Sequence, residues 1–211
     1  MHTVDGVTGT RRRRADAELT RQSIFRATNL LVQERHGLDF KLADVAEAAG
    51  IGAATVYRHF NSVHELCVEL HRSIYDELSA DFERITAEST GLRRFLSVCD
   101  HWVTSSVDWG AVAAYVRRGE GYLQQLRRGD PLVERFHASL DTAVRGLVAE
   151  GIVPEQDHDY AIMMWITMFD ERAIFDLRAT LGWTDERIAR TLARHVLAVL
   201  TTDVEHYTAR L

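Results

Sequence analysis

The sequence predicts an all-α protein, because apolar residues recur at the three- and four-residue spacing of amphipathic helices along most of the chain. Only two prolines occur in 211 residues, and residues that favour helix, such as Ala, Leu, Arg and Glu, are abundant. The chain is 46% apolar and 27% charged, the composition of a folded subunit with its own core. Disordered, collagen-like and disulfide-scaffold proteins are therefore excluded.

The first segment is predicted to be a basic arm. Residues 1–14 show no apolar periodicity and end in four arginines, so we expect them to be flexible. From Ala17 the pattern becomes that of an amphipathic helix, with Ile24 and Leu31 on its apolar face and Gly37 just after its end.

Three helices are predicted to follow the first one. The earliest starts at Leu42 and stops at Gly50, and the next runs roughly over 53–60. The third begins at Ser62, where a serine followed three residues later by Glu65 has the form of a capping box. It continues for several turns without a breaker.

The rest of the chain is predicted to form further helices separated by glycine-containing breaks. Asp130 is placed as an N-cap before Pro131, and Thr184 is placed in the same way before the last helix. That last helix carries an apolar stripe, which we expect to be core, dimer interface or both. The stripe consists of Ile188, Leu192, Val196, Val199 and Leu200.

The formal net charge of −6 conceals two differently charged parts. Residues 1–60 hold 9 Lys and Arg against 7 Asp and Glu, a net +2, whereas residues 61–211 hold 16 against 24, a net −8. A basic N-terminal part joined to an acidic remainder is compatible with nucleic-acid binding by the N-terminal part alone.

The sequence gives no sign of export or of a membrane segment. The arginine run is followed by Ala15 to Glu18 rather than by an apolar stretch, and the longest apolar run, 160–169, is about half as long as a bilayer requires. Cys67 and Cys99 show no metal-ligand pattern and are expected to be reduced thiols. We therefore expect a cytoplasmic protein.

Residues 42–60 carry the most informative motif. Ala46 is small enough for a second helix to approach, Gly50 can adopt the positive φ of a short turn, and Val56 can fill the angle between two helices. This is the spacing of a helix-turn-helix, whose second helix enters the major groove of DNA. An ordinary helical corner is the alternative, but the basic arm and the hydrogen-bonding residues of the second helix favour DNA.

The motif resembles the N-terminal domain of the tetracycline-repressor (TetR) family of bacterial transcription regulators. The resemblance is specific over about residues 17–70. It implies an all-α homodimer with a helix-turn-helix DNA-binding domain over 15–61 and a ligand-binding and dimerisation domain over 62–211, in which 62–87 form a connecting helix. The residues that carry the resemblance are Ala46, Gly50, Thr55, Val56, Tyr57, Arg58, His59, Phe60 and Ser62 to Leu66.

Residue roles follow from the resemblance by position. Tyr57 and His59 would contact phosphates, and Thr55 and Arg58 would lie at or near the bases. The full set of predicted DNA-binding residues is Arg11, Arg12, Arg13, Arg14, Lys41, Gly52, Ala53, Ala54, Thr55, Tyr57, Arg58 and His59.

The chain departs from the family pattern at four positions. Gly52 stands where a serine usually caps the second helix, and Ala53 where a polar residue is common. Val63 stands where a lysine usually opens the connecting helix, and Lys41 stands where threonine is common. We expect Lys41 and the arginines of residues 11–14 to supply the missing phosphate contacts.

Two aromatic segments of the larger domain predict either a small-molecule site or plain core. The run 100–109 sets two tryptophans on one helical face, and the run 160–169 is apolar all round, as in a helix buried on every side. Asp170 is the sharpest polar candidate, because it follows directly on an apolar run. The candidate ligand-binding residues are His101, Trp102, Ser105, Trp109, Tyr122, Met164, Trp165, Met168, Phe169 and Asp170.

An enzyme is the competing class. Glu134 with His137 and Glu155 with His158 have the Glu-x-x-His spacing of di-iron helix bundles, which also need two further glutamates on facing helices. The second pair lies at what reads as a solvated helix end, and no HExxH, P-loop or GxSxG motif occurs. We therefore expect no catalytic activity, no metal and no cofactor.

Taken together, the sequence predicts a repressor that binds a palindromic double-stranded operator as a homodimer. A small hydrophobic effector would release it by shifting the connecting helix. The acidic larger domain disfavours a polyanionic effector. An activator, or a ligand-insensitive regulator of the same family, would share these sequence features.

Overall fold

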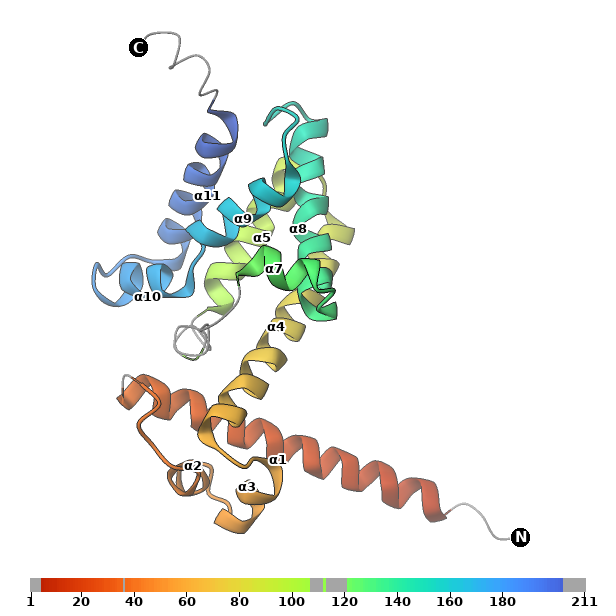
Figure 1. Ribbon diagram of the computed structural model, residues 1–211, viewed down its shortest axis with the longest axis vertical. Coiled ribbons are helices and arrows are strands. Elements are labelled where there is room, and N and C mark those ends of the chain that lie inside the picture. The colour runs from red at the N-terminus through yellow and green to blue at the C-terminus, as the bar shows by residue number, and fades with distance from the viewer. Residues whose placement is uncertain (1–4, 36, 107–111, 113–120, 203–211) are drawn as a thin grey trace. The chain divides into compact units, whose positions relative to one another are not determined.

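The computed structural model describes residues 5–35, 37–106, 112 and 121–202, with side chains from Ala15 onward (Figure 1). All regular structure in those residues is helical, which confirms the predicted all-α class. No helix in the described ranges is both long and apolar enough to span a bilayer. The helices are α1 (Asp5–Arg35), α2 (Leu42–Ala48), α3 (Ala53–His59), α4 (Val63–Glu88), α5 (Gly91–Ser105), α7 (Tyr122–Arg127), α8 (Pro131–Ala149), α9 (His158–Met168), α10 (Glu171–Ala179) and α11 (Asp185–Thr201).

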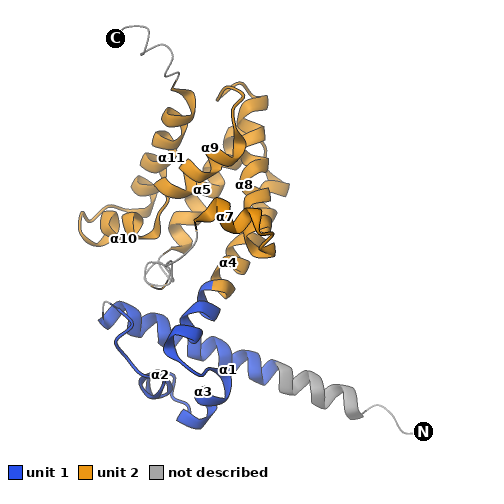
Figure 2. Cartoon of the chain, viewed as in Figure 1, with its two compact units in different colours: residues 1–71 blue, residues 72–211 orange. Residues whose placement is uncertain are grey.

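The chain divides into two compact units, residues 1–71 and 72–211, with the boundary inside α4 (Figure 2). The sequence-based boundary lay earlier, at the start of α4. The first turns of α4 belong with the N-terminal unit, since Leu66 is fully buried and Glu69 Oε2 lies 3.2 Å from Arg21 Nη2 of α1.

α1 begins at Asp5, which corrects the expectation that the first fourteen residues lack secondary structure. The backbone continues as helix through the four arginines, because arginine is a good helix former and the sequence contains no proline there. At its other end α1 stops at Arg35, just before Gly37, as predicted.

The core of the C-terminal unit forms where α5 packs against α8 and α11. At its centre the indole ring of Trp102 lies 5.6 Å from the ring of Phe82, 5.3 Å from that of Phe136 and 5.4 Å from that of Phe169, measured between centroids. Each of these side chains is fully buried. Burial of one such ring stabilises the fold by roughly 2–3 kcal/mol, so the aromatic cluster is a main source of stability in this unit.

Two helices of the C-terminal unit begin at the caps that the sequence predicts. Asp130 Oδ1 accepts a hydrogen bond from Leu132 N at 3.0 Å at the start of α8. Thr184 Oγ1 accepts one from Arg187 N at 3.3 Å at the start of α11. These bonds satisfy N–H groups that the first turn of a helix leaves without a backbone partner.

The start of α5 crosses the end of α8 at two glycines. Gly91 has φ of 50°, and a Cβ placed on Gly146 would lie 3.1 Å from Gly91 N. Across this crossing Glu150 Oε2 accepts a hydrogen bond from Leu92 N at 2.9 Å, so the carboxylate that follows one helix caps the first turn of the other. A Cβ on Gly91 would lie 1.7 Å from Glu150 Oε1.

We expect Gly91→Ala to destabilise the C-terminal unit more than Gly151→Ala does. Both residues have positive φ, and a Cβ on Gly151 would meet nothing within 4 Å. Gly151→Ala should therefore cost only the backbone strain of about 1–2 kcal/mol. Gly91→Ala should add the loss of the Glu150 cap, about 1 kcal/mol more. Equal free energies of unfolding in urea for the two variants would contradict this account of the crossing.

Candidate nucleic-acid interface

The turn between α2 and α3 takes its geometry from Gly50, which has φ of 65°. Gly50 N donates a hydrogen bond to Glu47 O at 3.0 Å, and Ile51 N donates one to Ala46 O at 3.0 Å. This pair of bonds is a Schellman motif, which ends α2 and turns the chain into α3. A residue with a Cβ at position 50 would be strained by about 1–2 kcal/mol.

The packing between α2 and α3 is that predicted from the sequence. Ala46 is 2% exposed and Val56 is fully buried. Phe60, which ends α3, is also buried, and its ring lies 6.1 Å from the ring of Phe25 on α1. The apolar side of α3 is therefore fixed against the rest of the N-terminal unit, and the opposite side is left exposed.

Most of the predicted DNA-binding residues lie on that exposed side. Tyr57 is 54% exposed, and Thr55 is partly buried. Lys41 is exposed at the start of α2, where its backbone N donates a hydrogen bond to Asp44 Oδ2 at 2.8 Å. The side chains of Arg11 to Arg14 lie outside the described residues. The remaining exposed members of the predicted set are Gly52, Ala53, Ala54, Arg58 and His59.

The start of α4 is held by a more extended network than the predicted capping box. Ser62 Oγ accepts a hydrogen bond from Glu65 N at 3.0 Å, as predicted. Glu65 Oε2 returns to Asn61 instead of to Ser62, accepting from Asn61 N at 2.9 Å and from Asn61 Nδ2 at 3.0 Å. Asn61 thus joins the end of α3 to α4. The sequence analysis missed this role, although the asparagine directly precedes the predicted capping box.

In the C-terminal unit, the aromatic members of the predicted ligand set lie in the core. Trp102, Trp165 and Phe169 are each at most 1% exposed, while Met164 and Met168 are partly buried. The helix that was expected to be buried on every side is not, since Tyr160 of α9 is 51% exposed. The predicted set also includes Trp109, which lies outside the described residues.

Two polar members of the predicted ligand set bind each other and α4. His101 Nε2 lies 2.8 Å from Asp81 Oδ2 and 3.2 Å from Ser105 Oγ. A hydrogen bond from Arg84 lowers the pKa of Asp81, against the opposing effect of burial, and His101 contributes to the same lowering. The negative charge that this favours on Asp81 holds α5 to α4 through His101.

Asp170 serves as a helix cap and not as a free anchor. Its Oδ1 accepts hydrogen bonds from Arg172 N at 3.0 Å and from Arg172 Nε at 2.9 Å, at the start of α10. The charge that follows the apolar run therefore has partners within the same turn, and its contact with a ligand stays a prediction.

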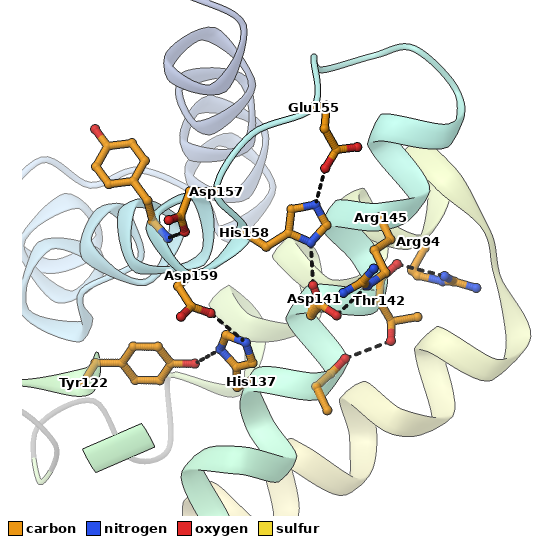
Figure 3. A network of polar contacts seen from close by, with 12 residues as sticks. Arg94, Tyr122, His137, Asp141, Thr142, Arg145, Glu155, Asp157, His158 and Asp159 are labelled. Carbon is orange, nitrogen blue, oxygen red and sulfur yellow. Dashed lines mark hydrogen bonds and ion pairs between the residues drawn. The ribbon is translucent and has the colours of Figure 1, made fainter. Parts of the chain in front are cut away.

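Tyr122 belongs to a polar network that joins α7, α8 and α9 (Figure 3). Its hydroxyl lies 2.9 Å from His137 Nδ1, and His137 Nε2 lies 3.4 Å from Asp159 Oδ1. Burial raises the pKa of Tyr122, so its phenol remains protonated and can donate to the histidine. Tyr122 is therefore occupied by a partner from its own unit.

The second histidine of the network closes α9 onto α8 (Figure 3). His158 Nδ1 lies 2.6 Å from Asp141 Oδ1, and Arg145 Nε donates to Asp141 Oδ2 at 2.7 Å. His158 Nε2 lies 3.5 Å from Glu155 Oε1. The histidines of the two Glu-x-x-His pairs thus serve as contacts between helices, and no group of three metal-ligating side chains occurs among the described residues.

The chain was compared with known proteins. Residues 27–70 match the family described as bacterial regulatory proteins, tetR family. The chain is 33% identical over 81 residues to the HTH-type transcriptional regulator SAR0097 of Staphylococcus aureus (strain MRSA252), an alignment that covers 38% of this chain. It spans 42% of the length of that relative.

Solved structures share the fold of the chain at low sequence identity. The fatty acid degradation regulator FadR from Bacillus halodurans superposes with a TM-score of 0.66 at 14% identity, covering 84% of this chain and 94% of its own. FadR from Bacillus subtilis in complex with stearoyl-CoA superposes with a TM-score of 0.65 at 18% identity, covering 86% of this chain and 97% of its own. LfrR from Mycobacterium smegmatis in complex with proflavine superposes with a TM-score of 0.59 at 22% identity, covering 88% of this chain and 98% of its own.

The polar network makes the stability of the C-terminal unit depend on pH. Burial raises the pKa of Asp141, but hydrogen bonds from Arg145 and His158 outweigh burial, and the pKa lies below its ordinary value of 3.8. A carboxyl group whose pKa is lower in the folded chain than in the unfolded chain stabilises the fold when the pH is above its unfolded pKa. This stabilisation is lost as the pH falls through the pKa of the folded chain.

We therefore expect Asp141→Asn to lower the free energy of unfolding at pH 7. The difference from wild type should shrink below about pH 4, because both chains then carry a neutral group at this position. Urea unfolding of both chains between pH 3 and 7 measures this difference in the free energy of unfolding. Asp176→Asn, at an exposed position of α10, is the control and should change little. A difference that stays constant over the whole pH range would contradict the assignment.

Proposed function

This chain belongs, through its N-terminal domain, to the tetR family of bacterial regulatory proteins, and on that premise we propose that it represses transcription by binding an operator as a homodimer. The observation that carries the proposal is the exposed side of α3. Val56 and the Gly50 turn fix the helix on its buried side, and Tyr57, Arg58 and His59 are exposed. A rigid helix with exposed donors is what major-groove binding requires.

Phosphate contacts are proposed to come from outside α3. Val63 cannot bind a phosphate, whereas Lys41 is exposed at the start of α2. The four arginines at residues 11–14 add four positive charges to α1. We propose that Lys41 and part of this arginine run neutralise phosphates beside the groove that α3 enters.

Two-fold symmetry is the second part of the proposal. α11 buries Ile188, Val196 and Leu200 in its own unit, whereas Leu192 and Val199 are less completely covered. We propose that the less covered side of this stripe meets a second copy. A symmetric dimer presents two copies of α3, which would enter major grooves about 34–36 Å apart, or a multiple of that, on an approximately palindromic site.

The effector is proposed to be a small hydrophobic molecule that binds in the C-terminal unit. The support is the aromatic cluster around Trp102, together with Met164 and Met168, which are partly buried and adaptable in shape. Two structural relatives were solved with stearoyl-CoA and with proflavine. Because residues 61–211 carry a net charge of −8, a neutral or cationic effector suits this chain better than a polyanion.

α4 is proposed to carry the response. It runs unbroken from Val63 to Glu88 and takes part in both units. An effector that binds the protein more tightly when α4 occupies one of two positions would favour that position and so move the two DNA-binding units of the dimer. A coupling free energy of about 1–3 kcal/mol would give a useful response.

The protein is proposed to be cytoplasmic. Burial raises the pKa of Cys67 to about 11, which keeps its thiol protonated and unreactive, as suits that location.

Selection from a random duplex library tests the proposal. We expect the full chain to select an inverted repeat whose half-site centres lie about 10 base pairs, or a multiple, apart, with two chains bound per duplex. Light scattering of the free protein and of the complex gives the stoichiometry. Selection of an asymmetric site by a single chain would contradict the dimer, and failure to select any duplex at low salt would contradict DNA binding.

Replacing the four arginines with glutamine tests their role in phosphate binding. Arg11, Arg12, Arg13 and Arg14 should be changed together, because glutamine preserves helix propensity and removes only charge. We expect the slope of log affinity against log salt to fall by about 0.9 for each phosphate that the variant no longer neutralises. Arg93→Gln, at an exposed position of α5, is the control. An unchanged slope in the quadruple variant would show that the arginines do not bind phosphates.

A further inference from the structure

The side of α3 opposite the buried Val56 carries one long side chain among very small ones. Successive residues of a helix are 100° apart, so Ala54 and Arg58, two positions before and after Val56, project to the side opposite it. Both are exposed, as are Gly52 and Ala53 just before them. The side of α3 that would lie deepest in a groove therefore offers one methyl group, that of Ala54, and a single guanidinium, that of Arg58.

Arg58 is already positioned along this surface. Its Nε donates a hydrogen bond to the backbone oxygen of Ala54, one turn earlier, at 3.1 Å. Within the described part of the chain, no carboxylate lies within ion-pair distance of Arg58. The bond to Ala54 uses Nε only, which leaves the two terminal amino groups of the fork to bind an acceptor outside the protein.

Tyr57 and Thr55 are less suited to the floor of the groove. Each is about 100° from Val56 around the helix and so lies at the border of the exposed side, where phosphates would pass. His59 is closer still to the buried side, and its ring lies 6.1 Å from that of Phe60. The base-facing positions are thus Ala54 and Arg58, whereas Ala53, three positions before Val56, lies as close to the buried side as His59 does.

We propose that α3 reads one thymine methyl group through Ala54 and one guanine through Arg58. The inference rests on the proposed function and specifies what the proposed operator contains. The thymine C5-methyl is the apolar group of the major groove and is matched by the alanine methyl, while guanine O6 and N7 match the arginine fork. Since one helical turn rises 5.4 Å and a base pair about 3.4 Å, the guanine lies within about two base pairs of the thymine.

Deoxyuridine substitution tests the methyl contact. Starting from the duplex that the full chain selects, each thymine of one half-site is replaced in turn by deoxyuridine, which removes the methyl group alone. We expect about a 4-fold loss of affinity at one position, the value for one buried methyl group. The ratio of affinities for the thymine and deoxyuridine duplexes should return to about 1 in Ala54→Gly.

The ratio of the affinities for the two duplexes does not change when a substitution lowers the stability of the protein, because both duplexes are measured with the same protein variant. Ala48→Gly removes an exposed methyl from α2 and is the matched control, so it should keep the wild-type ratio. A deoxyuridine duplex that binds as well as thymine at every position would overturn the methyl contact, while the proposed function would stand. Failure to select any duplex would overturn both.

The guanine contact has its own test. Replacing the guanine nearest the sensitive thymine by 7-deazaguanine removes the N7 acceptor, and we expect roughly a 10-fold loss for wild type, within the range for one bidentate pair. Arg58→Ala should bind all four bases at this position about equally. Retention of the guanine preference by Arg58→Ala would overturn the assignment of Arg58.

Discussion

The close crossing of α2 and α3 is the constraint on which the N-terminal unit depends. It needs a left-handed residue at Gly50, a small one at Ala46 and a filling one at Val56, and all three are present. Once these are set, the opposite side of α3 is exposed by geometry alone. The side chains on that side then contribute little to the core, so they are available for recognition. Stability and recognition thus occupy different sides of one short helix.

The C-terminal unit combines an aromatic core with polar contacts between helices. Trp102 and its neighbouring rings fill the centre, and a histidine–carboxylate pair fixes α5 to α4. A second such pair fixes α9 to α8 (Figure 3). These pairs are half-buried, so each costs some desolvation and is favourable only while its carboxylate is ionised. The buried rings and these contacts together hold the helices of the unit against one another.

Charge is distributed unevenly along the chain. The first sixty residues are net +2 and the rest are net −8, so the phosphates of DNA attract the part that contains α2 and α3 and repel the remainder. Such a chain is expected to bind DNA with moderate affinity. In the proposed function, sequence selectivity comes from the groove side of α3, where small side chains allow a close approach of the backbone to the bases.

The sequence by itself determined the features that depend on local periodicity and local chemistry. It predicted the all-α class, the Gly50 turn, the burial of Val56 and the caps at Asp130 and Thr184. Each of these depends on residues within about one or two turns of one another, so the pattern along the chain is enough to specify it.

Hydrogen-bond and ion-pair partners that lie far apart in the sequence could not be predicted in this way. Asp81 for His101, Asp141 for His158 and Glu150 for the start of α5 lie 20, 17 and 58 residues away in the chain. Only the packed structure shows that the histidines of the Glu-x-x-His pairs join helices and that the helix at 160–169 keeps an exposed side. The physical reason is that a buried polar group must find a partner in space, and its distance along the sequence does not constrain which partner it finds.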